Sequence, residues 1–214
     1  AHLSRIVLRR KKDDVLRGLP QKVERAYFIH PDKGTMSCNG EETALAGDFT
    51  EQLEIYNTIL YDYYRWAASR SRHRGKKAHS RAVQFLRLRQ VVLDPVLVED
   101  TEAESIELAA LKAIAEERLK NDKYGVVFSE FKEPLRAIRN YFVNKNIPVS
   151  YVDGEMDSQA RREEIDKFQN GETKLFISTI ATSGVGLHLT RGDYVVFLGK
   201  PLKDSTLQQA IDRL

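Results

Sequence analysis

Residues 174–190 read KLFISTIATSGVGLHLT, and this stretch decides the fold of the second half of the chain. It opens with a short apolar run that ends at Thr179, which is typical of a strand covered on both faces. A loop with Gly184 and Gly186 follows the run directly. Because ligands of open parallel sheets lie beyond the carboxyl ends of the strands, this loop is a candidate binding site.

The same alternation continues on both sides of this stretch. Three more apolar runs are predicted to be strands: YGVVFS (124–129), VSYVDG (149–154) and YVVFLG (194–199). Helical patterns precede and separate them, closed by Asn121 before the first strand and by Gly171 in a later case. Strands and helices that alternate with short connections predict an α/β fold, with a mostly parallel sheet flanked by helices on both faces.

The first hundred residues instead have a largely helical pattern. One strand is expected within 22–30, where apolar side chains alternate with a period of two. A loop is expected over 33–47, followed by a long helix from about Thr50. A later helix is predicted to end at Asp94, because Pro95 disfavours helical geometry in the residue before it.

The composition is that of a folded protein with a charged surface. Hydrophobic residues make up 42% of the 214 residues and charged residues 30%, which disfavours a disordered chain. No apolar run approaches the roughly 20 residues needed to cross a bilayer, so no membrane partner is expected. Cys38 is the only cysteine, and no Cys and His residues cluster at metal-binding spacing, which predicts a reducing, intracellular setting and no metal site.

Charge is unevenly distributed along the chain, although the net charge is only +3. Residues 65–89 carry many basic side chains and no acidic one, whereas residues 99–107 are rich in acidic side chains. Such local asymmetry indicates a surface that faces a polyanion. A solvated loop is the alternative interpretation of the basic stretch.

The glycine-containing loop has the residue types of a phosphate contact. Glycines let the backbone approach a phosphate, and the hydroxyls of Thr182, Ser183 and Thr190 can hydrogen-bond to its oxygens. The loop is not a dinucleotide fingerprint, since Leu189 stands where a third glycine would be required. A tight turn without a ligand is the alternative interpretation.

The sequence lacks the phosphate-cradling motif G-x-x-x-x-G-K-[ST]. Its two Gly-Lys pairs begin at Gly75 and Gly199, and Arg70 and Tyr194 occupy the positions of the first glycine. Without this motif the chain alone is expected not to bind and hydrolyse a nucleotide well, which fits half of a composite site.

Arg161 is a further candidate residue. It lies four and seven positions before Ile165 and Phe168, on or beside their apolar stripe. An arginine near a buried face requires a partner, unless its stem packs on the core and its head reaches water.

Six stretches of the sequence together resemble one known family. They occur in this order: LRRKKDDVLRGLPQKVE (8–24), LRQVVLDP (88–95), VVFSEF (126–131), DGEMDSQARREEIDKF (153–168), STIATSGVGLHLT (178–190) and QAIDR (209–213). The set resembles the second motor lobe of the Swi/Snf family of DNA-dependent ATPases, within the superfamily-two helicases. The resemblance spans nearly the whole chain. It implies a mostly helical segment with one strand over 1–102, the helical protrusion of the motor, and a RecA-like helicase C-terminal lobe over 103–214.

The resemblance implies half of an ATP-driven motor that translocates on double-stranded DNA or remodels it. ATP and Mg would be held mainly by an N-terminal motor lobe of the same parent chain, so this sequence is expected to be an excised piece, cut within motif VI and inactive alone. Arg213 would be an arginine finger for the nucleotide, with Gly184, Gly186 and Gln209 beside it. A surface Asp-Arg pair on a helix is the alternative interpretation of Arg213.

Contacts with the DNA backbone are implied for two groups of residues. The first lies at the predicted strand ends and motif V: Ser129, Ser178, Thr179 and Thr190. The second is the basic stretch: Arg72, Arg74, Lys76 and Lys77. Such contacts go to phosphate and sugar, so they would allow stepping along any sequence.

The sequence departs from the family pattern at several positions. Ser183 stands where paired glycines are common, Ala181 replaces a Lys or Arg, and Glu130 replaces a glutamine. These departures leave the subfamily open.

Two other functions are compatible with the residues: a non-catalytic nucleic-acid-binding module that uses the basic helices, and the lobe of an RNA helicase. The expected location is intracellular, in the nucleus of a eukaryote or in the cytoplasm of a bacterium or virus-infected cell.

Overall fold

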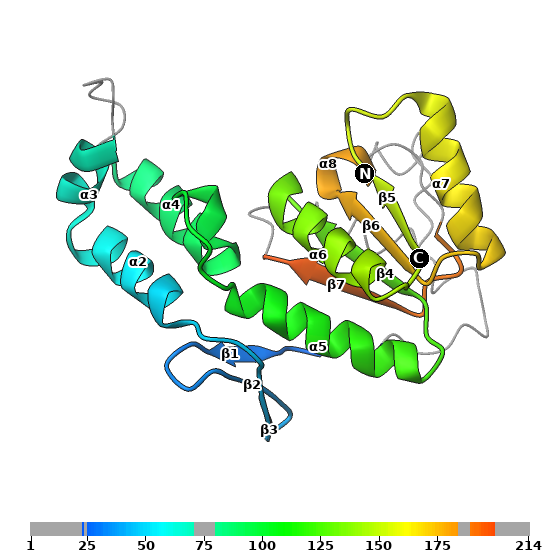
Figure 1. Cartoon of the computed structure of the whole chain (residues 1–214), viewed down its shortest axis with the longest axis horizontal. Helices are drawn as coiled ribbons and strands as arrows, with labels where there is room; N and C mark the ends of the chain where they lie inside the picture. Colours follow the sequence, from blue (N-terminus) through cyan, green and yellow to red (C-terminus); the bar gives the residue numbers. More distant parts are fainter. Residues whose placement is uncertain (1–22, 24, 71–79, 184–188, 200–214) are drawn as a thin grey trace, which may run out of the picture.

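The computed structural model describes residues 23, 25–70, 80–183 and 189–199 (Figure 1). Its first element is an antiparallel sheet of three short strands, β1 (Phe28–His30), β2 (Thr35–Cys38) and β3 (Glu41–Ala44), in the order β1-β2-β3. The strand expected within 22–30 is therefore confirmed over its last three residues.

The prediction of a loop over 33–47 is wrong, because this range contains the strands β2 and β3. A two-residue turn joins these strands, with Asn39 and Gly40 at φ values of 52° and 86°. Asn-Gly is the favoured pair for such a hairpin turn, since both residues tolerate positive φ. The hairpin lacks apolar alternation, and every residue of β3 is exposed, so periodicity alone does not reveal it.

A group of helices follows this sheet. They are α2 (Thr50–Tyr61), α3 (Tyr63–Arg70), α4 (Arg81–Leu93), a 3-10 turn η3 (Pro95–Leu97) and α5 (Ile106–Lys120). The predicted end of α4 at Asp94 is confirmed, and the Asp94 carboxylate accepts a hydrogen bond from Val96 N at 3.3 Å. Figure 1 shows α2, α3 and α4 extending to one side of the molecule, with β1–β3 beside α5.

Gln52 ties the helices α2, α4 and α5 together. Its side chain is buried, and its amide nitrogen donates to the carbonyl oxygens of Val91 at 2.8 Å and Val92 at 3.0 Å. Its amide oxygen accepts from Ile106 N at 2.9 Å, at the start of α5. Because every hydrogen-bonding group of this buried amide is used, the three helices are held in one arrangement.

The second half forms a four-stranded parallel sheet. Its strands are β4 (Gly125–Ser129), β5 (Val149–Val152), β6 (Leu175–Thr179) and β7 (Tyr194–Leu198), in the order β5-β6-β4-β7. The connecting helices are α6 (Lys132–Asn144), α7 (Ser158–Asn170) and the short α8 (Ile180–Ser183). The predicted α/β fold with a parallel sheet is confirmed.

Both faces of this sheet are covered. On one face, side chains of α5 and α6 such as Leu111 and Phe142 pack against Val127 and Ile177. On the other face, Phe168 of α7 packs against the opposite sides of the same strands. The strands β4 and β6 are buried at every residue, which explains their nearly continuous apolar sequence.

Helix α5 belongs to both halves of the molecule. Its Ile106, Ala110 and Ile114 pack against Met36 and Phe49 of the N-terminal part, while other residues of the helix cover the parallel sheet. The proposed division of the chain at residues 102 and 103 therefore lies just before a helix that both parts share, and this division remains a prediction.

Candidate functional site

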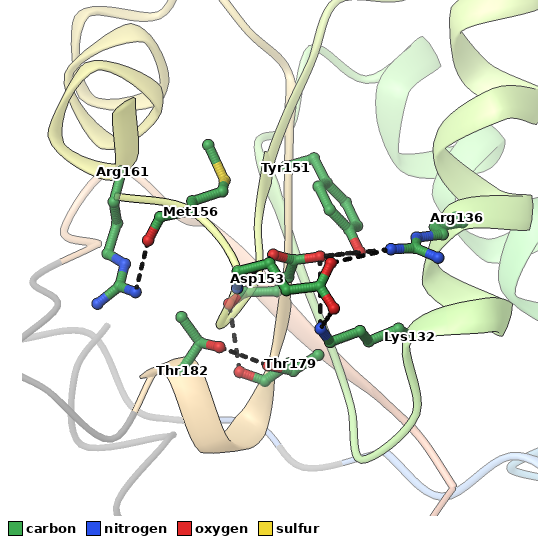
Figure 2. Close-up of polar contacts among 10 residues, drawn as sticks. Lys132, Arg136, Tyr151, Asp153, Met156, Arg161, Thr179 and Thr182 are labelled. Atoms are coloured by element: carbon green, nitrogen blue, oxygen red, sulfur yellow. Dashed lines mark hydrogen bonds and ion pairs between the residues drawn. The ribbon is translucent and has the colours of Figure 1, made fainter. Parts of the chain in front are cut away.

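The carboxyl ends of the parallel strands meet at one edge of the sheet. Ser129 ends β4, Asp153 follows β5 and Thr179 ends β6. Helix α8 begins directly after Thr179, and its Thr182 turns back so that the two hydroxyl oxygens lie 2.6 Å apart (Figure 2). This carboxyl edge is the place where open parallel sheets bind their ligands.

Asp153 is the buried charge of the carboxyl edge, with 4% of its surface exposed. Its carboxylate accepts hydrogen bonds from the Tyr151 hydroxyl at 3.2 Å and from Glu155 N at 2.9 Å. Two cations of α6 lie close by, with Lys132 Nζ at 3.9 Å and Arg136 Nη2 at 3.8 Å. The two hydrogen bonds and the two nearby cations compensate for the burial of the carboxylate.

Lys132 and Arg136 form a basic pair on the first turns of α6. Glu155 contacts both, with oxygen atoms 2.7 Å from Lys132 Nζ and 3.5 Å from Arg136 Nη2. The hydrogen bond with Glu155 raises the pKa of Lys132 and so favours its charged form further. Figure 2 shows both cations pointing toward Asp153 from the α6 side. Sequence analysis missed this pair, although two bases four residues apart directly after a strand end were a usable signal.

The predicted DNA contacts Ser129, Ser178 and Thr179 are brought together at the carboxyl edge, but their side chains are buried. The Ser129 hydroxyl accepts from Phe131 N at 3.3 Å, and the Ser178 hydroxyl donates to the Thr179 carbonyl at 3.2 Å. These hydroxyls support the local backbone in this arrangement. Their contact with a DNA backbone stays a prediction.

Thr190 lies at the opposite edge of the sheet from Thr179. Its hydroxyl accepts from the side-chain amide of Gln169, near the end of α7, at 3.5 Å. The adjacent Arg191 donates to the Tyr124 hydroxyl at 3.2 Å, just before β4 begins. The structure therefore does not bring Thr190 to the residues with which the sequence motif grouped it.

The guanidinium of Arg161 is hydrogen-bonded at only one of the two nitrogens that the structure characterises. Its Nη2 donates weakly to the Met156 carbonyl at 3.4 Å, while its Nε is buried and has no hydrogen-bond partner in the part of the chain that the structure describes. In Figure 2 its guanidinium lies on the α7 side of Asp153, across from Arg136. The partner expected for Arg161 is therefore present at Nη2, whereas Nε has none among the described residues.

Other predicted site residues lie outside the described residues: Gly184, Gly186, Gln209, Arg213, Arg72, Arg74, Lys76 and Lys77. Within the described ranges there is no group of three or more His, Cys, Asp or Glu side chains that could hold a metal ion. In the same ranges no helix is both long enough and apolar enough to cross a bilayer.

The fold and this polar carboxyl edge define a RecA-like lobe, and comparison with known proteins identifies its family. Residues 107–214 match the model of the helicase conserved C-terminal domain. The chain belongs to this family, and it is the C-terminal lobe of a Swi2/Snf2-type member.

Two solved structures and one relative illustrate the similarity. The C-terminal domain of a Sulfolobus solfataricus SWI2/SNF2 ATPase is 25% identical, with a TM-score of 0.56 over 69% of this chain and 66% of that one. The core of a Sulfolobus solfataricus SWI2/SNF2 ATPase in complex with dsDNA is 26% identical, with a TM-score of 0.57 over 70% of this chain and 32% of that one. The chromatin remodeling factor mit1 of Schizosaccharomyces pombe is 25% identical over 96% of this chain and 15% of its own length.

The chain spans only 12%, 15% and 18% of the length of three curated relatives. The similarity therefore concerns one lobe of much longer proteins.

Proposed function

We propose that this chain is the second motor lobe of an ATP-driven translocase or remodeller that acts on double-stranded DNA. The observation that supports it best is a parallel sheet with a polar carboxyl edge in a chain that matches the helicase C-terminal domain over residues 107–214. The solved relative in complex with dsDNA supports the choice of nucleic acid.

In this proposal ATP and Mg are bound mainly by an N-terminal lobe of the same polypeptide. This assignment is consistent with the missing G-x-x-x-x-G-K-[ST] motif. Arg213, with Gln209, Gly184 and Gly186, reaches the phosphates when the lobes close. A guanidinium is suited to this role because its planar donors match phosphoryl oxygens and its charge opposes the negative charge that shifts during transfer. Delivery from a separate lobe makes hydrolysis depend on closure, which links it to movement.

DNA binds at the carboxyl edge in this proposal, through its sugar-phosphate backbone. Lys132 and Arg136 supply the charge there, since their side chains are 31% and 50% exposed. The basic stretch with Arg72, Arg74, Lys76 and Lys77 tracks the backbone further along. Contacts of this kind carry no sequence information, as a translocase requires.

The proposal is tested by replacing Arg213 in the full-length protein. Arg213→Ala is expected to lower DNA-stimulated ATP turnover by about a thousandfold or more, with duplex binding retained. Arg213→Lys should rescue little, because lysine lacks the bidentate fork. Arg162→Ala, an exposed arginine of α7, is the matched control and should leave turnover unchanged. Normal turnover in Arg213→Ala would contradict the motor and favour the non-catalytic module.

A nucleic-acid-binding module without catalysis remains the second candidate, because basic side chains without acidic ones are concentrated over residues 65–89. An RNA helicase is separated from both by comparing ATPase stimulation by duplex DNA and by RNA. We also propose an intracellular location, nuclear in a eukaryote and cytoplasmic in a bacterium or virus-infected cell.

A further inference from the structure

A groove runs between the N-terminal helices and the parallel sheet. It consists of two adjacent hollows of about 340 and 290 Å³, which share Tyr56, Val92 and Glu107 as lining residues. The larger hollow extends to Phe85 on α4 and to Leu198 at the end of β7. The smaller one is also lined by Ile29 of β1 and by Gln52 and Leu53 of α2. The larger is at the lower end of the range of about 300 to 1,000 Å³ for small-molecule pockets and the smaller is just below it, so each suits a side chain better than a nucleotide.

The walls of the groove are mostly apolar and partly open to solvent. Phe85 is 56% exposed and Val92 is 40% exposed, although both are large apolar side chains. Apolar side chains gathered at an open hollow indicate a binding surface more than scattered exposed ones do. The two hollows are therefore suited to receive apolar side chains of another polypeptide segment.

Glu107 places a carboxylate where the two hollows meet. It accepts a hydrogen bond from Gly199 N, and burial raises its pKa to about 7. In the described part of the chain it makes no ion pair, since the nearby Arg89 lies 2.8 Å from Glu130 instead. Above pH ~7 the groove thus contains an ionised carboxylate that a cation on a ligand would neutralise.

We propose that this groove binds a short segment of a partner protein in which a Lys or Arg stands between two apolar side chains. The apolar side chains enter the two hollows, and the cation meets Glu107 between them. A nucleic acid is disfavoured as the occupant, because its phosphates would face both Glu107 and Glu130. The segment contacts α2, α4 and α5 together with the ends of β4 and β7, so it joins the two halves of the molecule. This binding is independent of the proposed ATPase function.

The test uses the full-length protein and fluorescein-labelled synthetic peptides of roughly 12 residues that carry two leucines on one helical face. The residue between the leucines is Arg, Gln or Glu in three otherwise identical peptides. At pH 8, where Glu107 is ionised, fluorescence polarisation is expected to show the Arg peptide binding about tenfold more tightly than the Glu peptide. With Glu107→Gln this preference should fall to about twofold, because the carboxamide still accepts from Gly199 N but carries no charge.

Two further variants complete the design. Glu117→Gln, at an exposed position of the same helix α5, should keep the full preference. Val92→Ser should weaken all three peptides, since it removes apolar surface from both hollows. Equal binding of the three peptides, or an unchanged preference in Glu107→Gln, would overturn the proposal. Self-association that Glu107→Gln abolishes, measured by sedimentation, would also overturn it by identifying a second copy as the occupant.

Discussion

Lys132 Nζ and Glu155 Oε1 lie 2.7 Å apart at the carboxyl edge of the parallel sheet. Glu155 also lies 3.5 Å from Arg136, and 71% of its side chain is exposed. The exposed carboxylate of Glu155 thus forms ion pairs with Lys132 and Arg136, the two cations that would contact a phosphate in the proposed DNA complex. Because exposed ion pairs contribute little free energy, a phosphate can displace Glu155 at small cost.

Removing the charge of Glu155 is therefore expected to strengthen DNA binding. Glu155→Gln should tighten binding of a short duplex by a few fold, measured by fluorescence polarisation at several salt concentrations. Lys132→Ala should weaken it and lower the slope of log affinity against log salt by about one. Lys145→Ala, at the other end of α6, is the control for loss of a lysine. Identical affinities for Glu155→Gln and the parent would place DNA elsewhere on the molecule.

The paired hydroxyls of Thr179 and Thr182 give a second prediction. Both residues are buried, so Thr182→Val leaves the Thr179 hydroxyl without its 2.6 Å partner. We expect this change to lower the free energy of unfolding by about 1 to 3 kcal/mol. The double change to valine should cost less than the sum of the single ones, because no buried hydroxyl is then left unpaired. Urea unfolding of the four variants measures the coupling, and strict additivity would show that the pair does not interact.

Glu107 should make stability fall as the pH rises. Burial raises its pKa from 4.5 to about 7 in the folded protein, so between these values the folded state keeps a proton that the unfolded chain releases. The folded state then binds more protons, and stability decreases with rising pH across this window and levels off above it. Glu107→Gln should be more stable than the parent by up to about 3 kcal/mol at pH 8, with no difference below pH ~4. Urea unfolding from pH 4 to 8 tests this, with Glu117→Gln expected to follow the parent.

Tyr194 and Gly125 meet at the amino edge of the sheet. Burial raises the pKa of Tyr194 to about 12, and its hydroxyl has no hydrogen-bond partner in the described ranges. Tyr194→Phe is therefore expected to leave stability unchanged or to raise it by about 1 kcal/mol. Gly125→Ala should instead destabilise by about 1 to 3 kcal/mol, because the added methyl group would overlap the Tyr194 ring and Leu175. Thermal unfolding of both variants measures these changes in stability. A large loss of stability in Tyr194→Phe would show that the Tyr194 hydroxyl has a hydrogen-bond partner.

The parallel sheet could be predicted from the sequence because its central strands are buried on both faces. Runs such as GVVFS and LFIST carry this burial directly in their composition. The end of α7 could also be predicted, because Gly171 directly follows the helix and adopts a φ of 79°, a conformation that favours glycine. The β2–β3 hairpin was missed because its outer strand faces solvent at every position, so no apolar periodicity marks it.

The site was predictable only in part. The rule on strand ends placed Ser129 and Thr179 at the carboxyl edge, where the structure has them, but it could not show that their hydroxyls hydrogen-bond within the protein. The four-residue spacing of Lys132 and Arg136 indicates that they share one face of α6. Their approach to Asp153 depends on α6 lying beside β5, which the spacing does not show. Thr190 was grouped with Thr179 because they are close in sequence, whereas the structure places the two residues at opposite edges of the sheet.

The hairpin turn at Asn39 and Gly40 has a practical use in spectroscopy. Cys38 stands immediately before it, is partly exposed, and is the sole thiol of the sequence. Maleimide chemistry would therefore attach one fluorophore at a known point of the N-terminal sheet without any engineering of the lobe. If the proposed N-terminal lobe carried an acceptor dye, energy transfer from this position would report any opening and closing of the two lobes in single molecules.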